Sequence, residues 1–269
     1  MALNSCQAAE PSALRLYVLD CGYMDMAGWE DFETFFGVPL TAVEKPAQAN
    51  PCFLVVNNGN TLLWDAGLSD ATPSEPFITE FGVMFSMPTK LRDQLELIEI
   101  PPQSIDYFAI SHLHFDHIGN WAYFIHTDTF LQEAELQAAL MSGNENIGYV
   151  EDTVREIAKF EDLILLDGDH DVFGDGLVTI LSTPGHTAGH QALLVKLKNY
   201  GPIILSGDTV HFSEELTHEV SPVFNDSNQE SIASLARLIA LKTSLKGHLW
   251  IQHDPMQHQN RKLSPEFYD

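Results

Sequence analysis

The chain has 269 residues and carries 13 Lys and Arg against 38 Asp and Glu, which gives a formal net charge of −25 at pH 7 with histidine neutral. So few cations cannot readily form the basic surface that binding to phosphate backbones requires, and nucleic acid is therefore not an expected partner. With 45% hydrophobic residues the chain can bury a large core, which excludes general disorder.

The first residues lack the features of an intact secretory signal. Residues 1–13 have neither a basic region nor a long apolar stretch, and we predict a flexible segment there. The longest apolar runs are far shorter than the roughly 20 residues that span a bilayer, so no membrane span is expected and the expected compartment is the cytoplasm. Leu3-Asn4-Ser5-Cys6 loosely resembles the end of a bacterial lipoprotein signal. A periplasmic or lipid-anchored protein is therefore the alternative, if Cys6 follows a removed signal.

Short apolar runs alternate with segments of helical period, a pattern that predicts a layered α/β fold. The predicted strands are 14–20, 52–56, 60–65, 106–111, 162–167, 176–182, 191–197, 202–208 and 248–254. The predicted helices are 89–99, 131–141, 151–160 and 228–242. In the last helix Asn228 is the expected N-cap, and the expected apolar face consists of Ile232, Leu235 and Ile239 with Ala236 and Leu238. No Pro-rich or Gly-rich linker interrupts the chain, so residues 14–269 are predicted to form a single domain.

Two segments, 21–51 and 66–88, show no regular period and are rich in Phe, Met, Trp and Pro. Long apolar loops in a compact domain favour a role in lining a ligand pocket. The candidates for that wall are Trp29, Phe32, Phe35, Phe36, Phe81, Met84, Phe85 and Met87. Equally, these residues could close the edge of the core or form the contact of a homodimer.

The three cysteines, Cys6, Cys21 and Cys52, are odd in number and show no C-x-x-C spacing. That pattern supports neither a disulfide framework nor a cysteine-based zinc site. We therefore predict reduced, mostly packed thiols.

Chemistry-bearing side chains concentrate in the run from Ser111 to Asn120, SHLHFDHIGN. Its metal-competent members are His112, His114, Asp116 and His117, and they follow the apolar run 106–110 directly. One histidine alone is more often a core or surface residue, but three with an aspartate in six positions favour a metal site.

Further candidate ligands stand at the ends of other predicted strands. His186 follows 176–182, Asp208 closes 202–208, and His253 closes 248–254. Because ligands in α/β proteins collect at the carboxyl ends of strands, we expect these side chains to meet the first group at one rim. Any one of them alone has an ordinary structural explanation, such as a helix cap.

The combined set of five imidazoles and two carboxylates is about what two first-row metal ions with open positions require. We predict a dinuclear centre with a carboxylate oxygen bridging the ions. The absence of thiolates favours zinc and leaves iron, cobalt or manganese as alternatives.

At this point the chain resembles the metallo-β-lactamase-fold hydrolases, whose H-x-H-x-D-H motif corresponds to His112 to His117. Within that superfamily it is most similar to the quorum-quenching N-acyl homoserine lactonases. The similar segments are LYVLDCG (16–22), LLWDAGL (62–68), SHLHFDHIGN, STPGHTAGHQALLV (182–195), SGD (206–208) and QHD (252–254). The resemblance implies an αββα sandwich, with two mixed sheets flanked by helices.

Site roles also follow from the resemblance, residue by residue. One ion would be held by His112, His114 and His186, the other by Asp116, His117 and His253, with Asp208 bridging. Asp65 matches a family aspartate that orients a ligand histidine, and a turn-forming role explains it equally well. His190 is expected to assist the site from the turn that carries it. Where many lactonases of the family have a tyrosine that contacts the substrate carbonyl, this chain has His211.

The metals imply hydrolysis, because a hydroxide bridging two divalent ions is available at neutral pH. Its attack on a lactone carbonyl would open the ring of a small acyl lactone to a hydroxy acid, and the expected substrate is an N-acyl homoserine lactone. Asp116 is the expected proton carrier to the leaving oxygen, and His211 is a second candidate donor. Such a neutral substrate also suits the acidic charge of the chain.

Other functions remain open at this stage. The same fold hydrolyses other esters, thioesters and β-lactams, although few Lys or Arg residues are present to hold a carboxylate or glutathione. An iron-dependent oxygen or nitric oxide reductase would need a carboxylate in place of His114 and an attached electron-transfer domain. A metal-binding protein without catalysis is the third alternative.

Overall fold

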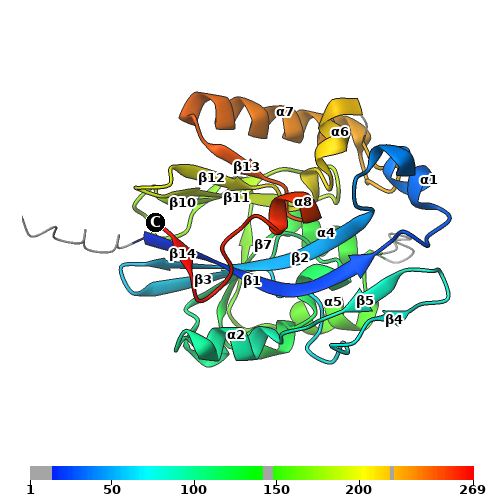
Figure 1. Ribbon diagram of the computed structural model, residues 1–269. Helices are drawn as coiled ribbons and strands as arrows, with labels where there is room; N and C mark the ends of the chain where they lie inside the picture. The colour runs from blue at the N-terminus through cyan, green and yellow to red at the C-terminus, as the bar shows by residue number, and fades with distance from the viewer. Residues whose placement is uncertain (1–13, 142–147, 219–220) are drawn as a thin grey trace, which may run out of the picture.

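Two β-sheets pack face to face and helices cover their outer faces (Figure 1). The computed structural model describes residues 14–141, 148–218 and 221–269. This arrangement confirms the expected αββα sandwich, and both sheets contribute to one shared core, from which we infer a single domain. The expected flexible segment 1–13, which includes Cys6, lies outside the described residues.

The larger sheet has the strand order β4-β5-β1-β2-β3-β6-β7-β8, with β14 paired to β1. Its strands are β1 (Leu14–Asp25), β2 (Ala47–Asn57), β3 (Asn60–Trp64), β4 (Phe77–Ile78), β5 (Met84–Ser86), β6 (Tyr107–Ala109), β7 (Asp128–Gln132), β8 (Leu163–Leu166) and β14 (Phe267–Tyr268). Strands β3, β6, β7 and β8 run parallel to one another, whereas β1 pairs antiparallel with β2. Apolar side chains of α2 (Leu91–Leu97), α4 (Glu133–Leu140) and α5 (Glu151–Ile157) cover its outer face.

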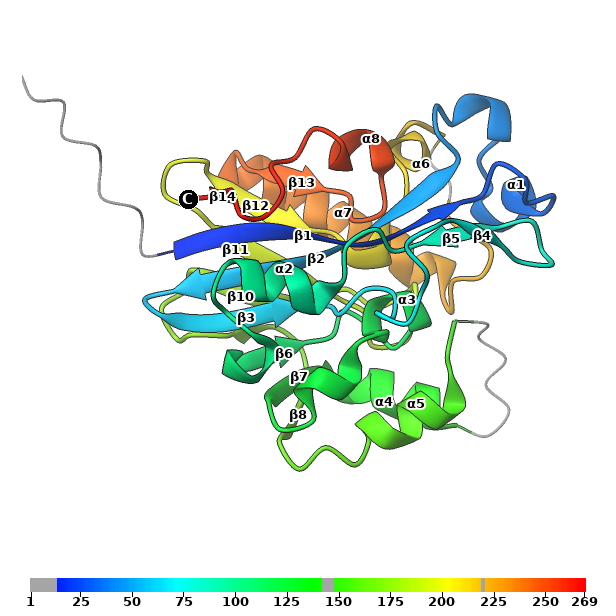
Figure 2. The same ribbon diagram turned by 60° about the horizontal axis from the view of Figure 1, so that its bottom comes forward.

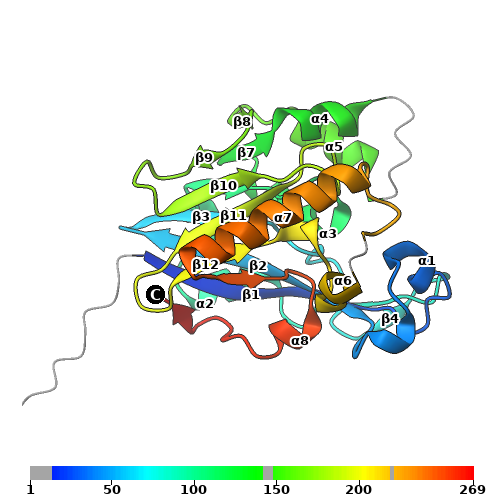
Figure 3. The ribbon, with the colours of Figure 1, turned by 90° about the horizontal axis from the view of Figure 1, so that it is seen from above.

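The smaller sheet has the order β13-β12-β11-β10-β9. Its strands are β9 (His170–Asp171), β10 (Val178–Ser182), β11 (Gln191–Lys196), β12 (Pro202–Leu205) and β13 (His248–Trp250). The long helix α7 (Asn228–Leu245) lies across its outer face (Figure 3). Between the sheets, Leu16, Phe53 and Trp64 pack with Ile180 and Leu193, all fully buried.

Short helices complete the connections. They are α1 (Phe32–Phe36), α3 (Phe115–Ile118), α6 (Ser213–His218) and α8 (Pro255–His258), with 3-10 turns η1 (Leu40–Ala42), η2 (Pro102–Ser104), η3 (Trp121–Phe124) and η4 (Gly207–Thr209). Figure 2 shows α1, α6 and the β4–β5 hairpin at the same end of the sandwich. None of the helices in the described part of the chain has the length and apolar character that crossing a membrane requires.

The two segments predicted to be irregular contain regular structure. A bulge between Asp20 and Tyr23 lets β1 continue to Asp25, where it pairs with both β2 and β5. The segment 66–88 contains the β4–β5 hairpin. The β1–β5 pairing joins strands distant in sequence, and β4 and β5 are too short to show a period, so local periodicity did not indicate them.

The predicted apolar face of α7 is confirmed only in part. Leu238 is buried as predicted and Leu235 is half-buried, but Ile232 and Ile239 are 59% and 42% exposed, whereas Ser231 and Ser234 are buried. The physical reason is the close approach of the loop before the helix, because a Cβ on Gly185 would lie 2.2 Å from the Ser231 backbone nitrogen. Small residues are therefore required on this face, and the Ser234 hydroxyl donates to the Pro184 carbonyl at 2.7 Å. The N-cap is Ser227, one residue before the predicted Asn228.

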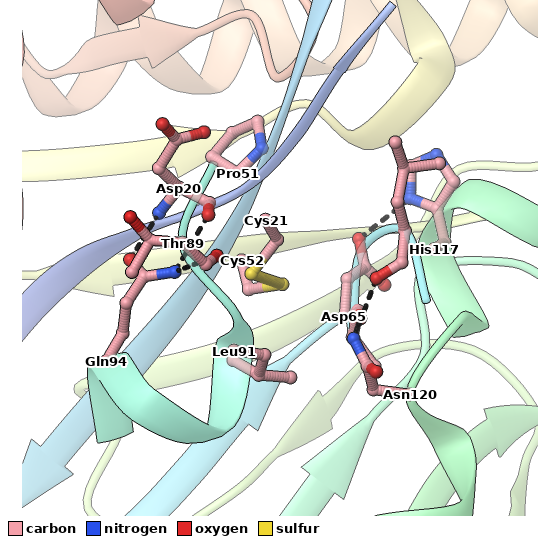
Figure 4. The surroundings of a disulfide bond; sticks show 12 residues. Asp20, Cys21, Pro51, Cys52, Asp65, Thr89, Leu91, Gln94, His117 and Asn120 are labelled. Atoms are coloured by element: carbon pink, nitrogen blue, oxygen red, sulfur yellow. Dashed lines mark hydrogen bonds and ion pairs between the residues drawn. A yellow bond between two sulfur atoms is a disulfide. The ribbon is translucent and has the colours of Figure 1, made fainter. Parts of the chain in front are cut away.

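The prediction of reduced thiols is wrong for two of the three cysteines, because Cys21 and Cys52 form a disulfide (Figure 4). Leu19 on β1 is paired with Cys52 on β2, and the following bulge brings Cys21 beside it, with 5.7 Å between the Cα atoms. Cysteines on neighbouring strands need no short sequence spacing, so the search for C-x-x-C could not find this pair. The disulfide supports the turn after β3, since a Cβ on Gly67 would lie 2.2 Å from the Cys21 Cβ.

This connectivity predicts the thiol content of the protein. Of the three cysteines, two are joined, so titration with a thiol reagent in denaturant should detect one thiol per chain before reduction and three after it. The Cys21→Ser variant should show two thiols without reduction. Three reactive thiols in unreduced wild-type protein would contradict the disulfide.

Candidate metal centre

Candidate ligands follow strands that end at one rim of the sandwich. The segment 111–117 follows β6, His186 follows β10, Asp208 follows β12 and His253 follows β13. Strands β12 and β13 run parallel, and β10 has the same direction because β11 is antiparallel to both of its neighbours. The structure therefore brings all seven predicted ligands together at buried positions.

A first cluster consists of three imidazoles whose ring nitrogens converge. The Nε2 atom of His186 lies 3.2 Å from His112 Nε2 and 3.1 Å from His114 Nδ1. On the far side of two rings, Ser111 Oγ lies 3.1 Å from His112 Nδ1, and Asn225 Oδ1 accepts from His186 Nδ1 at 2.9 Å. Burial holds the pKa of His112 and His186 well below the ordinary value, so both rings are neutral and able to ligate.

A second cluster contains Asp116, His117 and His253. The two Nε2 atoms lie 3.2 Å apart, and Asp116 Oδ2 is 3.6 Å from His117 and 3.7 Å from His253. The outer nitrogens are fixed, because His117 Nδ1 donates to Asp65 Oδ2 at 2.9 Å and His253 Nδ1 donates to the Ala49 carbonyl at 2.8 Å. Both rings therefore present Nε2 toward the centre.

Asp208 lies between the two clusters and faces both. Its Oδ2 is 3.5 Å from His186 Nε2 and 3.8 Å from His112 Nε2. Its Oδ1 is 3.0 Å from His253 Nε2 and 3.3 Å from His117 Nε2. This Oδ1 is buried without a hydrogen-bond donor among the described residues. One carboxylate with one oxygen toward each imidazole group has the arrangement of a bridging ligand.

Buried carboxylates dominate the electrostatics of the centre. Asp65, Asp116 and Asp208 are buried, and their ion pairs within the described residues are all with histidines. Burial opposes protonation of His117, but these carboxylates outweigh it and raise its pKa well above the ordinary value. Neighbouring imidazoles similarly lower the pKa of Asp208, although burial opposes this. Uncompensated buried anions are costly, and two divalent cations would neutralise them. The nitrogen and oxygen donors fit first-row metals.

Asp65 and His190 hold parts of the centre in place. Asp65 adopts a left-handed backbone, with φ of 59°, and accepts bonds from the Ser111 backbone and the Gln252 side chain, each at 2.7 Å. His190 Nε2 accepts the Asp208 backbone N–H at 2.8 Å, while its Nδ1 lies 2.9 Å from the Thr183 hydroxyl. Burial lowers the pKa of His190 to about 4, so the ring is neutral and remains an acceptor.

Sequence reasoning missed several supporting residues. Asn50 Nδ2 donates to Asp116 Oδ2 at 2.8 Å, across 66 residues of sequence. Asn225 contacts His186, 39 residues away in the sequence, and Gln252 contacts Asp65, 187 residues away. Polar residues with such distant partners carry no local pattern, and no signal in one sequence could have identified them.

His211 faces the centre from the turn after η4. Its Nε2 is 3.3 Å from Asp208 Oδ2, and its Nδ1 is 3.4 Å from a carboxylate oxygen of Glu215. Burial opposes its protonation, but Glu215 and Asp208 outweigh this and raise its pKa to about 10. The backbone N–H groups of His211 and Phe212 also donate to Glu215, which fixes the turn. The ring therefore turns Nε2 to the Asp208 oxygen that also faces the first cluster, and Nδ1 to Glu215.

An apolar cavity of about 170 Å³ opens over the two clusters. Its apolar wall consists of Met24, Met26, Trp29, Phe35, Phe36, Val83, Phe85, Phe115 and Phe224. Candidate ligands that line it are His114, Asp116, His186 and Asp208, joined by His211 and Gln48. Trp29, Phe35, Phe36 and Phe85 thus lie where the sequence placed them. The other four candidates do not line the cavity. Phe32 and Met87 are buried in the core, as the alternative prediction allowed, and Phe81 and Met84 are exposed.

The hydrogen bond from His117 to Asp65 predicts a specific loss of metal. In Asp65→Asn an amide donor replaces an acceptor of the His117 ring, so the affinity for one of two ions should fall about 10- to 100-fold. Competition with a chelator would measure this. Asp128→Asn, a change at an exposed aspartate, should leave both affinities unchanged. Equal affinities in Asp65→Asn and wild type would contradict the role.

Comparisons with known proteins agree with this geometry. The sequence profile of the Metallo-beta-lactamase superfamily matches residues 47–246. An N-acyl homoserine lactonase from Bacillus sp is 28% identical over 223 residues, covering 80% of this chain and 85% of that protein. A crystal structure of a B. thuringiensis AiiA variant with N-decanoyl-L-homoserine at its active site has a TM-score of 0.76 at 22% identity, covering 96% and 100% of the two chains. The dizinc lactonase AidC has a TM-score of 0.68 at 15% identity, and the match covers 96% of this chain and 94% of AidC.

Proposed function

The chain belongs to the metallo-beta-lactamase superfamily, and on this premise we propose that it is a two-metal hydrolase that opens the ring of N-acyl homoserine lactones. One observation carries the proposal. The Asp208 carboxylate turns one oxygen to each of two histidine clusters, directly below an apolar cavity. A shared carboxylate and an apolar cavity suit a neutral acyl lactone.

The proposed ligand assignment follows the two clusters. His112, His114 and His186 would hold one ion, Asp116, His117 and His253 the other, and Asp208 both. Zinc is the proposed metal, with iron, cobalt or manganese as alternatives, because all donors are nitrogen or oxygen. When bound, such ions lower the pKa of a water molecule and polarise a carbonyl group.

The proton chemistry falls to two side chains of the cavity. Water adds to the lactone carbonyl carbon, the bond to the ring oxygen breaks, and that oxygen must gain a proton to give a hydroxy acid. Asp116 is the proposed carrier, and its Oδ2 is held by the Asn50 amide. His211 is the second proposed catalytic residue, placed to donate to the carbonyl or the leaving oxygen. Its Nε2 lies 3.3 Å from Asp208 on the side of the first cluster.

The cavity wall favours an acyl amide over the substrates of other hydrolases of this fold. Its aromatic and methionine side chains suit an alkyl chain, and Gln48 offers a carboxamide with no hydrogen-bond partner among the described residues. That group could pair with the substrate amide. Among the described residues of the lining there is no Lys or Arg to hold the carboxylate of a β-lactam or of glutathione.

Two further expectations stay predictions. A homodimer would bury Phe77, Ile78 and Phe81, which are exposed on and beside the β4–β5 hairpin.

The Cys21–Cys52 disulfide favours an oxidising compartment, the alternative to the cytoplasm, because cytosolic proteins rarely keep structural disulfides.

The proposed reaction predicts metal-dependent release of acid from a lactone. Zinc-loaded or cobalt-loaded wild-type protein should open N-hexanoyl homoserine lactone, as measured by proton release. His112→Ala removes a ligand of the first cluster and should lower kcat/KM by at least about 100-fold. His126→Ala, at an exposed histidine outside the centre, is the matched control and should retain activity. If the metal-loaded wild type leaves this lactone intact, the lactonase proposal fails.

The position of His211 predicts a separable effect on catalysis. His211→Ala should keep both metal ions but lose about 100-fold in kcat, since a positioned proton donor contributes at least that much. His211→Tyr introduces the residue found in many lactonases of the family and should retain activity within about tenfold. Steady-state kinetics with metal analysis of each variant would test this. An unchanged kcat in His211→Ala would refute the catalytic role.

A further inference from the structure

Glu135 carries a fully buried carboxylate behind the first histidine cluster. It lies in the first turn of α4, and its exposed fraction is 0%. The carboxylate accepts hydrogen bonds from the Leu113 backbone N–H at 2.9 Å, the Gly189 backbone N–H at 3.0 Å and the Tyr149 hydroxyl at 3.1 Å. Three segments far apart in sequence therefore meet at one side chain.

The two backbone donors belong to the loops that carry the first cluster. Leu113 stands between His112 and His114, and Gly189 lies three residues after His186. A Cβ on Gly189 would lie 2.2 Å from the Glu135 backbone nitrogen, so the second loop lies directly against the start of α4. One carboxylate thus fixes the separation of the loops whose three imidazoles converge.

The third donor belongs to a segment that packs on the His114 ring. Tyr149 and His114 form an isolated β-bridge, and their rings meet edge to face with centroids 5.2 Å apart. The Phe115 N–H donates to the Gly148 carbonyl at 3.0 Å. A Cβ on Gly148 would lie 2.2 Å from the His114 ring, so this segment restricts the ring orientation.

The chemistry of this position requires a carboxylate. All three partners are donors, and a carboxylate offers only acceptors, whereas a glutamine would turn its own N–H group toward one of them. Within the described residues Glu135 pairs with no Lys or Arg, so its negative charge is buried close to a predicted cation site.

We infer that Glu135 is a positioning residue for one metal subsite, the one formed by His112, His114 and His186. It acts through the two ligand-bearing loops, as Asp65 acts on the subsite of His117. Each subsite thus has its own buried carboxylate outside the ligand set. This inference rests on the proposed two-metal function.

The test is metal binding by Glu135→Gln, a change of nearly the same size. Metal-free protein would be titrated with Co²⁺ against a chelator, with the visible spectrum recorded at each step. Wild type should bind two ions. In Glu135→Gln the affinity for one ion should fall at least about tenfold while the other stays unchanged, and the spectral component lost should be the one that Asp65→Asn retains. Glu133→Gln, at an exposed glutamate of the same helix, is the matched control and should match wild type.

The outcomes separate a positioning role from general stability. If Glu135→Gln lowers the affinity for both ions equally, or leaves both affinities unchanged, the inference is overturned. If that variant does not fold, Tyr149→Phe takes its place, because it removes one donor to Glu135 and leaves both backbone hydrogen bonds. It should lower the affinity for the same single ion by a few-fold. No change in Tyr149→Phe would then overturn the inference. The number of ions bound by wild-type protein is measured before any variant. Fewer than two ions would contradict the proposed function itself.

Discussion

The centre of this protein depends on the cost of burying negative charge. Asp65, Asp116, Asp208 and Glu135 are all buried, and none pairs with a Lys or Arg within the described residues. Hydrogen bonds and imidazoles compensate part of this cost, and cations held by the histidines would compensate the rest. The fold therefore maintains an anionic interior that is suited to binding metal. Bound cations would reverse the local charge, and negative charge that develops on a substrate could then be stabilised inside an acidic protein.

The rim position makes this arrangement possible. Strands from both sheets end beside one another, so short turns can carry ligands while the strands themselves remain buried and rigid. Hydrogen bonds between turns then set the distances between ligands. The disulfide supports the ligands indirectly, because it packs against Gly67 in the turn that begins with Asp65. Above the rim, residues of the segment before β2 and of the β4–β5 hairpin supply much of the apolar wall, and candidate ligands form the floor of the same cavity.

The resemblance to the lactonases implies a tyrosine at the position where this chain has His211. The imidazole does not stand alone, because Glu215 accepts from the backbone of the same turn and lies 3.4 Å from its ring. A phenol would need no such partner. The carboxylate instead favours a protonated ring that can donate toward the cavity.

The sequence by itself determined a layered α/β fold and the seven candidate ligands, because a run such as SHLHFDHIGN and strand-end positions are local properties. The family, the αββα sandwich and the division of the ligands into two groups followed from the resemblance of these motifs to a known family. Only the tertiary structure decided that Asp208 turns one oxygen to each cluster and that Asn50, Glu135 and Gln252 hold the ligand loops. It also decided the disulfide and the serine face of α7, where the sequence prediction was wrong. Each of these depends on contacts between residues that only chain folding brings within hydrogen-bonding or packing distance, and no local pattern encodes such contacts.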